Sequence, residues 1–339
     1  MKTIKSILTI AVTASFMLSS CNSEEEQLPK DETQTLSKND LTFNFKTAKS
    51  IQGKGINKTL VVAEDINTKL KDYGIAQIEI YNQAHNLADK DVLTVIPIID
   101  ASNEYRTGFR FIPNDPRREG RDNLTYVVVS EFATSPSGIP SEQIFDDMYD
   151  VWENASVCNN VAIDKQAFSL ATDGFPSTIL NLGDGVSSPV ADHNVIGYIP
   201  AFIFDLIGAS STNTLAVNFS FGFRDENGNF TDINGDGKID LSHTETWFND
   251  NVNWSADGLA PGSVDIASVA LHEFGHSLGL GHSGVLIASV NENGQPDGDF
   301  LQFSPVNVMN PSYIGNPKRD LAGDDNSIYC EQFSAWPWY

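Results

Sequence analysis

Three histidines and one glutamate form the group of residues best suited to chemistry in this sequence. His272 and His276 lie four residues apart, so on a helix both imidazoles share one face and can reach a single metal ion. Glu273, between them, can take a proton from water on that ion. The pattern continues as HEFGHSLGLGH, and Gly279 supplies the sharp turn that brings His282 back to the same ion.

The ligand set favours zinc, and its open coordination favours hydrolysis. Histidine pairs at this spacing also occur as structural residues, but three of the six histidines fall within this one short motif, which argues against a structural role. Three neutral imidazoles leave the fourth position of zinc to water, as in catalytic sites. Zinc acidifies such a water and polarises a carbonyl, while Glu273 serves as general base and returns the proton to the leaving amine. The motif predicts one catalytic zinc and peptide hydrolysis.

The motif HExxHxxGxxH and the later run VMNPSY at residues 308–313 resemble metzincin metalloproteases. In such enzymes Met309 would form the methionine turn, a hydrophobic floor under the metal and not a ligand. The form Met-x-Pro-x-Tyr is similar to the matrixin branch, in which Pro311 and Tyr313 would line the pocket for the side chain after the scissile bond. Over about residues 119–336 the chain is similar to bacterial secreted matrixin-like zinc proteases.

This resemblance implies an α+β fold. A metzincin catalytic domain would have a twisted mixed sheet of about five strands, two main helices and a methionine turn, preceded here by a small β-rich N-terminal region. A peptide substrate would lie extended along an edge strand, for which we take residues 215–221. Hydrophobic patterns predict the individual elements, namely strands at 41–45, 92–99, 124–129, 215–221 and 246–248, and helices from Ser141 to Ala155 and from Ser263 to Gly279.

Two departures separate this chain from animal matrixins. Those enzymes hold a second, structural zinc with histidines on the fourth and fifth strands, and the matching positions here are Val217 and Trp247. We therefore expect no structural zinc at these positions. The interval between His282 and Met309 is longer than in matrixins, which predicts a longer loop beside the substrate pocket and leaves the specificity open.

The N-terminal part predicts export and four segments. Residues 1–20 have a positive start and an apolar run too short to span a bilayer, which is typical of a signal peptide. The run LSSC resembles a lipobox ending in Cys21, and ordinary cleavage beside an incidental cysteine is the alternative. We expect an acidic tether at 21–40, an N-terminal domain or pro-segment at 41–118, and the catalytic domain at 119–339. The acidic start of the tether resembles the tag that sends some bacterial lipoproteins to the cell surface.

The three cysteines bear on both export and regulation. If Cys21 carries the lipid, Cys158 and Cys330 remain, and an oxidising compartment permits them to pair, so we expect one disulfide. No cysteine lies between Cys21 and Cys158, so the thiolate latch of animal matrixins is absent. If residues 41–118 act as a pro-segment, another ligand such as an aspartate must block the metal.

A second candidate metal site is a loop with oxygen-bearing side chains at alternate positions around a glycine, as in EF-hand-type calcium loops. Its twelfth position is His243 and not the usual glutamate. Calcium binding then needs help from outside, for example from Glu245 or backbone carbonyls, and the alternative is a plain turn between strands. The candidate calcium ligands are Asp232, Asn234, Asp236 and Asp240.

The net charge of the chain bears on its expected partners, and two alternative functions stay open. The net charge of −24 provides no basic surface to displace counterions from phosphates, which argues against nucleic acid. The expected partners are protein or peptide substrates and an outer membrane, reached through lipid on Cys21; the sequence does not fix the oligomeric state. Two alternatives stay open, a non-catalytic surface adhesin or binding module on the same fold, and a zinc hydrolase of a non-peptide bond. The intact Glu273 argues against the first.

Overall fold

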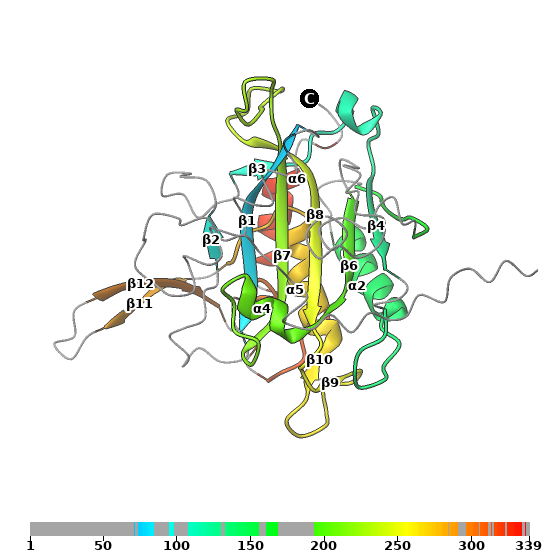
Figure 1. Ribbon diagram of the computed structural model, residues 1–339, viewed down its shortest axis with the longest axis vertical. Coiled ribbons are helices and arrows are strands. Elements are labelled where there is room, and N and C mark those ends of the chain that lie inside the picture. Colours follow the sequence, from blue (N-terminus) through cyan, green and yellow to red (C-terminus); the bar gives the residue numbers. More distant parts are fainter. Residues whose placement is uncertain are drawn as a thin grey trace, which may run out of the picture. The chain divides into compact units, whose positions relative to one another are not determined.

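Helix α5 (Ile266–Ser277) carries His272 and His276 of the HEFGHSLGLGH motif and packs against one face of a mixed β-sheet (Figure 1). In this computed structural model the described residues are 71, 74–84, 95–97, 108–129, 133–155, 161–168, 193–283, 285–290, 296–304, 306–310, 313, 315–322, 324–333 and 336. The expected signal peptide, Cys21, the acidic tether and the strand at 41–45 lie outside this part of the chain.

Eight of the described strands build one sheet, in the order β2-β1-β7-β8-β6-β4-β5, with β3 beside β8. Neighbouring strands run antiparallel from β2 through β1 and β7 to β8, and parallel from β8 through β6 and β4 to β5. The strands are β1 (Ile75–Ala84), β2 (Val95–Pro97), β3 (Phe109–Arg110), β4 (Leu124–Val128), β5 (Ile163–Lys165), β6 (His193–Ile199), β7 (Thr214–Phe223) and β8 (Ile239–Asn249).

This mixed sheet with its few helices confirms the expected α+β class. The sheet is larger than the expected five strands because β1, β2 and β3 come from the predicted N-terminal region and pair with it. The prediction that residues 215–221 form an edge strand is wrong in this conformation. These residues lie in β7, and β1 pairs with the outer side of β7. The sequence pattern of β7 alone could not reveal a pairing with a strand more than a hundred residues away.

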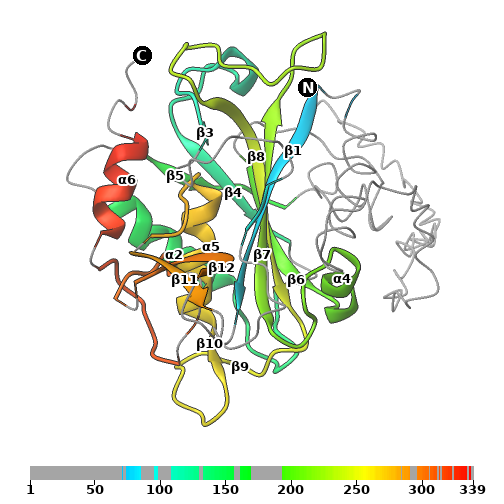
Figure 2. The same cartoon turned by 90° about the vertical axis from the view of Figure 1, so that its left-hand side faces the viewer.

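Helices cover both faces of the sheet. Figure 2 shows α2, α5 and α6 on one face and α4 on the other. No helix in the described part of the chain is long and apolar enough to cross a membrane. The remaining elements are η2 (Pro116–Arg118), α2 (Glu142–Asn154), α4 (Ala201–Leu206), α6 (Asp325–Phe333), and the paired strands β9 (Trp254–Ser255) with β10 (Val264–Asp265) and β11 (Val285–Val290) with β12 (Pro296–Phe303).

The core lies between the sheet, α2 and α5, and its contacts hold α5 in place. As its spacing predicted, α2 turns one apolar face inward, and the rings of Tyr149 and Phe274 stack with centroids 4.1 Å apart. The Trp152 indole N–H donates to the Leu271 carbonyl at 2.8 Å, directly before His272. The fully or nearly buried side chains of α2 are Phe145, Met148, Tyr149 and Trp152.

Both ends of α5 are set by local chemistry. The helix begins at Ile266 and not at Ser263, because Val264 and Asp265 pair with β9 and the Asp265 carboxylate then caps the Ser268 N–H. At the other end Gly279 has φ +83°, a left-handed conformation that side chains disfavour. This turn redirects the chain toward His282, as the motif predicted.

Candidate metal centre

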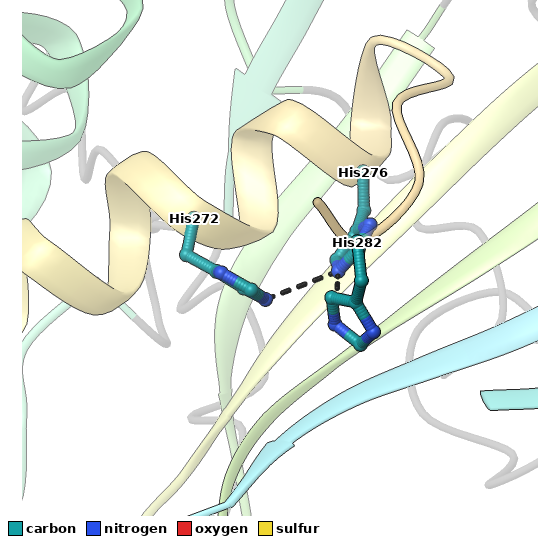
Figure 3. Close-up of side chains that lie close together, drawn as sticks. All are labelled: His272, His276 and His282. Atoms are coloured by element: carbon teal, nitrogen blue, oxygen red, sulfur yellow. Dashed lines mark hydrogen bonds between the residues drawn. The ribbon is translucent and has the colours of Figure 1, made fainter. Parts of the chain in front are cut away.

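The three histidines of the motif converge on one point. The Nε2 atom of His276 lies 3.1 Å from Nε2 of His272 and 3.1 Å from Nε2 of His282 (Figure 3). Three nitrogens at zinc bonding distance in a tetrahedron lie roughly 3.3 Å apart. Among the described residues, this is the one group of histidine, cysteine and acidic side chains close enough together to share a metal ion.

Backbone carbonyls orient the two helical imidazoles. The Nδ1 atom of His272 lies 2.8 Å from the Val308 carbonyl, and that of His276 lies 2.7 Å from the Leu280 carbonyl. A carbonyl only accepts, so both Nδ1 atoms carry the proton and both Nε2 atoms present lone pairs. Two lone pairs 3.1 Å apart cannot bond to each other; a cation between them makes the arrangement favourable. The donor set therefore fits a metal ion.

Burial keeps these imidazoles neutral. All three rings are buried, and this burial lowers the pKa of His272 to about 4, with a partial opposing effect from the hydrogen bond to Val308. Burial also lowers the pKa values of His276 and His282 well below the usual range, and the neighbouring imidazoles add to the shift. At neutral pH the lone pairs are available to a metal without prior loss of a proton.

Glu273 is the most unusual residue of the site. Its side chain is fully buried, and neither carboxylate oxygen has a hydrogen-bond partner in the described part of the chain. Burial raises its pKa well above the usual range. Buried carboxyl groups are almost always paired, so an unpaired one on the helix that carries His272 and His276 indicates a functional group and not a structural one.

Met309, predicted to form a methionine turn, packs against α5 at Gly275. Met309 is fully buried, and a Cβ built on Gly275 would lie only 2.2 Å from the Met309 sulfur. The absence of a side chain at Gly275 therefore lets the methionine pack against α5. The Asp325 carboxylate in α6 accepts from the backbone N–H of Val308 at 2.7 Å and of Met309 at 3.2 Å, which holds the carbonyl that orients His272.

The sequence did not single out Gly275 or Asp325. A glycine inside an amphipathic helix is a recognised sign of close packing, so Gly275 offered a signal. Asp325 offered none, because one acidic residue among 45 carries no mark of its buried role.

The predicted substrate pocket is described at one of its two residues. The Tyr313 side chain is buried, and its hydroxyl accepts from the Asp265 N–H at 3.4 Å, beside an ion pair between Asp265 and Arg319. This contact ties the segment after the methionine turn to the start of α5. Pro311 lies outside the described residues, and the pocket assignment stays a prediction.

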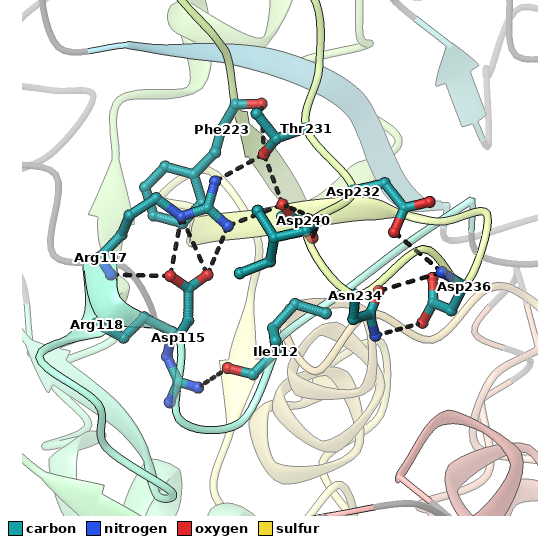
Figure 4. A network of polar contacts seen from close by, with 11 residues as sticks. Ile112, Asp115, Arg117, Arg118, Phe223, Thr231, Asp232, Asn234, Asp236 and Asp240 are labelled. Carbon is teal, nitrogen blue, oxygen red and sulfur yellow. Dashed lines mark hydrogen bonds and ion pairs between the residues drawn. The ribbon is translucent and has the colours of Figure 1, made fainter. Parts of the chain in front are cut away.

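The candidate calcium loop is held by hydrogen bonds within the protein (Figure 4). The fully buried Asp240 accepts from Arg117 at 2.8 Å and from the Thr231 hydroxyl at 2.6 Å. Asp232 accepts from the N–H groups of Asp236 at 3.1 Å and Gly237 at 2.8 Å. These carboxylates are not gathered around one point, so calcium binding stays a prediction.

The suggested help from Glu245 is wrong. Glu245 is buried in the middle of β8 and accepts from the Trp247 indole N–H at 3.1 Å. The strand rise puts it about 16 Å from Asp240, too far to reach the same ion. His243, at the twelfth loop position, is stacked on Phe221 with ring centroids 4.4 Å apart.

The remaining sequence-predicted residues are placed as follows. Val217 and Trp247, predicted from the sequence to stand where animal matrixins have zinc ligands, are cross-strand neighbours and fully buried. Cys330 lies in α6 and is disulfide-bonded. Cys158 lies outside the described residues, so the pairing of these two cysteines stays a prediction.

Comparisons with known proteins point the same way as this geometry. Residues 204–293 match the family model described as Matrixin, the peptidase family M10. This segment resembles matrixin metallopeptidases. It contains the three histidines and Glu273 and ends before Met309. A stretch of 39 residues is 46% identical to matrix metalloproteinase-25 of Mus musculus, covering 12% of this chain and 6% of the mouse protein. Matrixins use zinc, and the three-histidine cluster fits a zinc site.

Proposed function

We propose that this protein is a zinc-dependent endopeptidase that hydrolyses peptide bonds in proteins. One observation carries the proposal: Glu273, next to His272 on α5, has a buried carboxyl without a hydrogen-bond partner among the described residues, and the Nε2 atoms of His272, His276 and His282 converge. A structural zinc site would satisfy its ligands without an unpaired carboxylate beside it. Two helical imidazoles, one imidazole after the glycine turn and a free base are the parts that metal-assisted hydrolysis needs.

The chain's own residues perform the following steps. His272, His276 and His282 would hold zinc, which when bound supplies a Lewis acid for the scissile carbonyl and for a water nucleophile. The Glu273 carboxylate would accept the proton of that water. Glu273 then delivers the proton to the leaving amine. The carbonyl of Val308 keeps the Nδ1–H tautomer of His272 throughout.

Cellular location and further metal binding complete the proposal. A lipobox-like sequence and an acidic segment after Cys21 support export as a lipoprotein anchored to the outer membrane, with the catalytic part reaching proteins outside the cell. Calcium would bind the Asp232–Asp240 loop only after its carboxylates rearrange, because Asp240 is engaged by Arg117. The proposed calcium binding is tested by comparing the melting temperature of the protein in calcium with that in a calcium chelator. Equal melting temperatures would contradict it.

Metal dependence of casein cleavage tests the main proposal. Purified full-length protein is mixed with unfolded casein before and after zinc removal by a chelator, and again after one equivalent of zinc is restored. We expect cleavage to disappear with the metal and return with zinc. Unchanged cleavage in the chelator would contradict the proposal.

The two alternatives give different results in the same assay. A binding module on this fold binds zinc but cleaves no substrate in any form; the buried Glu273 carboxyl, without a partner among the described residues, argues against this alternative. A zinc hydrolase of other bonds leaves casein intact and hydrolyses esters or small amides with the same zinc dependence.

A further inference from the structure

Helix α6 contacts the metal centre at two places, one near each end of the helix. Asp325 and Gln332 are seven residues apart, which is two helical turns, so they share one face and lie about 10 Å apart along the axis. Asp325 accepts from the backbone N–H groups of Val308 and Met309. Gln332 is 3% exposed and lies at the glycine turn that leads to His282. The two ends of α6 therefore reach different parts of the site.

The Gln332 amide fills the space that the absence of a side chain at Gly279 leaves. A Cβ built on Gly279 would lie 2.6 Å from Gln332 Nε2 and 3.7 Å from the Phe109 carbonyl oxygen. Favourable contacts between such atoms occur at about 3.5–4.0 Å, so the amide lies directly against the backbone of the turn. The turn cannot shift toward α6 without displacing this amide.

The Gln332 amide is itself held at both of its polar atoms. Its Nε2 donates to the Phe109 carbonyl at 3.1 Å, and its Oε1 accepts from Lys238 Nζ at 3.2 Å. Phe109 is fixed in turn, because β3 pairs with β8 and the Phe109 side chain is buried in the core. With both ends of the amide bonded, its position against Gly279 is fixed.

The turn that Gln332 supports sets the position of two ligands. The Gly279 N–H donates to the His276 carbonyl at 2.8 Å, which closes the end of α5. The Leu280 carbonyl is the group that orients His276, through Nδ1 at 2.7 Å. His282 follows two residues later. A displacement of the turn would therefore change both the orientation of His276 and the position of His282.

Other contacts hold α6 in place on the face of the sheet that α2 and α5 also cover (Figure 2). Tyr329 is fully buried, and its ring centroid lies 5.7 Å from that of Trp152 and 4.9 Å from that of Phe333. Cys330 is disulfide-bonded. Because core packing and a covalent bond both fix the helix, its two contacts with the metal centre extend from a stationary element.

We propose that α6 supports the metal centre at two points and that Gln332 is a positioning residue for His276 and His282. Asp325 fixes the carbonyl that orients His272. Gln332 fixes, through the glycine turn, the carbonyl that orients His276. Gln332 acts through the turn and not as a ligand. This inference rests on the zinc site of the proposed function and does not require peptide hydrolysis.

The Nδ1 protons of His272 and His276 in the metal-free full chain test the proposal. Each proton is observed by NMR with isotope-labelled histidine, assigned by substitution of that histidine, and its exchange with solvent is measured. Gln332→Met keeps the length of the side chain and removes both hydrogen bonds of the amide. Gln143→Met makes the same change at an exposed position of α2 and is the matched control. Asp325→Ala disturbs the other contact of α6.

We expect the two contacts of α6 to affect different protons. In Gln332→Met, exchange of the His276 proton should rise roughly 2- to 10-fold, as expected for the loss of a hydrogen bond of ordinary net strength, while that of His272 stays unchanged. In Asp325→Ala the pattern should reverse. Zinc affinity, measured by competition with a chelating dye, should fall about 10-fold in Gln332→Met, at the lower end for residues that orient ligands, and should not change in Gln143→Met.

Lys238→Met provides a second variant. It removes one hydrogen bond of the Gln332 amide from a partly exposed position, so it disturbs the core less and should produce the same selective pattern with a smaller size. If Gln332→Met does not fold, Lys238→Met decides alone. Equal acceleration of both Nδ1 protons, as a general loosening of the fold would give, or unchanged exchange at His276 overturns the positioning role.

Casein cleavage by the wild-type protein keeps the two proposals apart. A protein that shows the selective pattern but cleaves no casein supports the positioning role and contradicts the proposed peptidase function. A protein that cleaves casein while both protons respond alike retains the peptidase function and loses the positioning role of Gln332.

Discussion

Gly275→Ala tests how the methionine turn supports the histidine helix. Alanine is a better helix former than glycine, so propensity alone predicts a gain of about 1 kcal/mol. The added methyl group would lie 2.2 Å from the Met309 sulfur, 2.9 Å from its terminal methyl carbon and 2.9 Å from the Trp152 ring. Favourable contacts between such atoms occur at about 3.5–4.0 Å, so the methyl group must displace buried atoms.

The steric effect is the larger of the two. Overpacking of a well-filled core costs about 1–3 kcal/mol, and we take the upper part of this range, about 2–3 kcal/mol, because Met309 and Trp152 are both fully buried and leave little room to relax. We expect Gly275→Ala to lower the free energy of unfolding of the metal-free protein by about 1–2 kcal/mol net, a fall of roughly 2–8 °C in melting temperature. Zinc affinity should weaken too, because displacement of Met309 shifts the adjacent Val308 carbonyl that orients His272.

Thermal and urea unfolding, followed by zinc titration, measure these effects. Gly108→Ala is the matched control, since a Cβ there meets no atom within 4 Å. In the double variant Gly275→Ala with Met309→Ala, the loss should be smaller than the sum of the single losses by at least about 1 kcal/mol. A Gly275→Ala protein that is as stable as the wild type, or more so, would refute the packing account.

Three further predictions follow from the same contacts. Asp325→Ala leaves the methionine-turn amides without their acceptor, so zinc affinity should fall about 10- to 100-fold in a competition titration, while the exposed Asp324→Ala should have little effect. Burial lowers the pKa of His272 from 6.5 to about 4, so the unfolded chain binds protons that the folded chain rejects. In a Glu273→Gln background, which removes the opposing contribution of the raised Glu273 pKa, stability of the metal-free protein should be full above pH 6.5 and fall steadily toward pH 4; a flat profile would contradict this. Arg117→Met leaves two buried carboxylates unpaired and should cost about 3 kcal/mol in urea unfolding, against about 0–1 kcal/mol for Lys165→Met in a partly exposed ion-pair cluster.

The sequence predicted those parts of the site that lie within one stretch of chain. His272, His276 and His282 could be grouped because helical spacing and the glycine turn decide their positions locally. The amphipathic helix at α2 followed from its apolar period for the same reason. The start of α5 was misplaced by a few residues, because Val264 and Asp265 pair with β9, a contact that a helical period does not encode.

Contacts between distant segments set the limit of prediction. The pairing of β1 with β7 joins two strands whose patterns fit many partners, so the covered edge could be found only in three dimensions. Asp325 likewise becomes part of the metal centre only because α6 folds back under Val308. The candidate calcium loop has the side-chain spacing of an EF-hand loop. Arg117, from a distant turn, donates to Asp240, a contact that the spacing alone does not predict.

The most direct test of the zinc peptidase account is the rate of casein cleavage by the full-length protein compared with its Glu273→Gln variant at equal zinc content. Glutamine keeps the size of the side chain and removes the base, so the ligands should still bind zinc. General base catalysis contributes typically 10²–10⁴-fold, and we predict a loss of that order in the variant. A Glu273→Gln protein that cleaves casein as fast as the wild type would contradict the account.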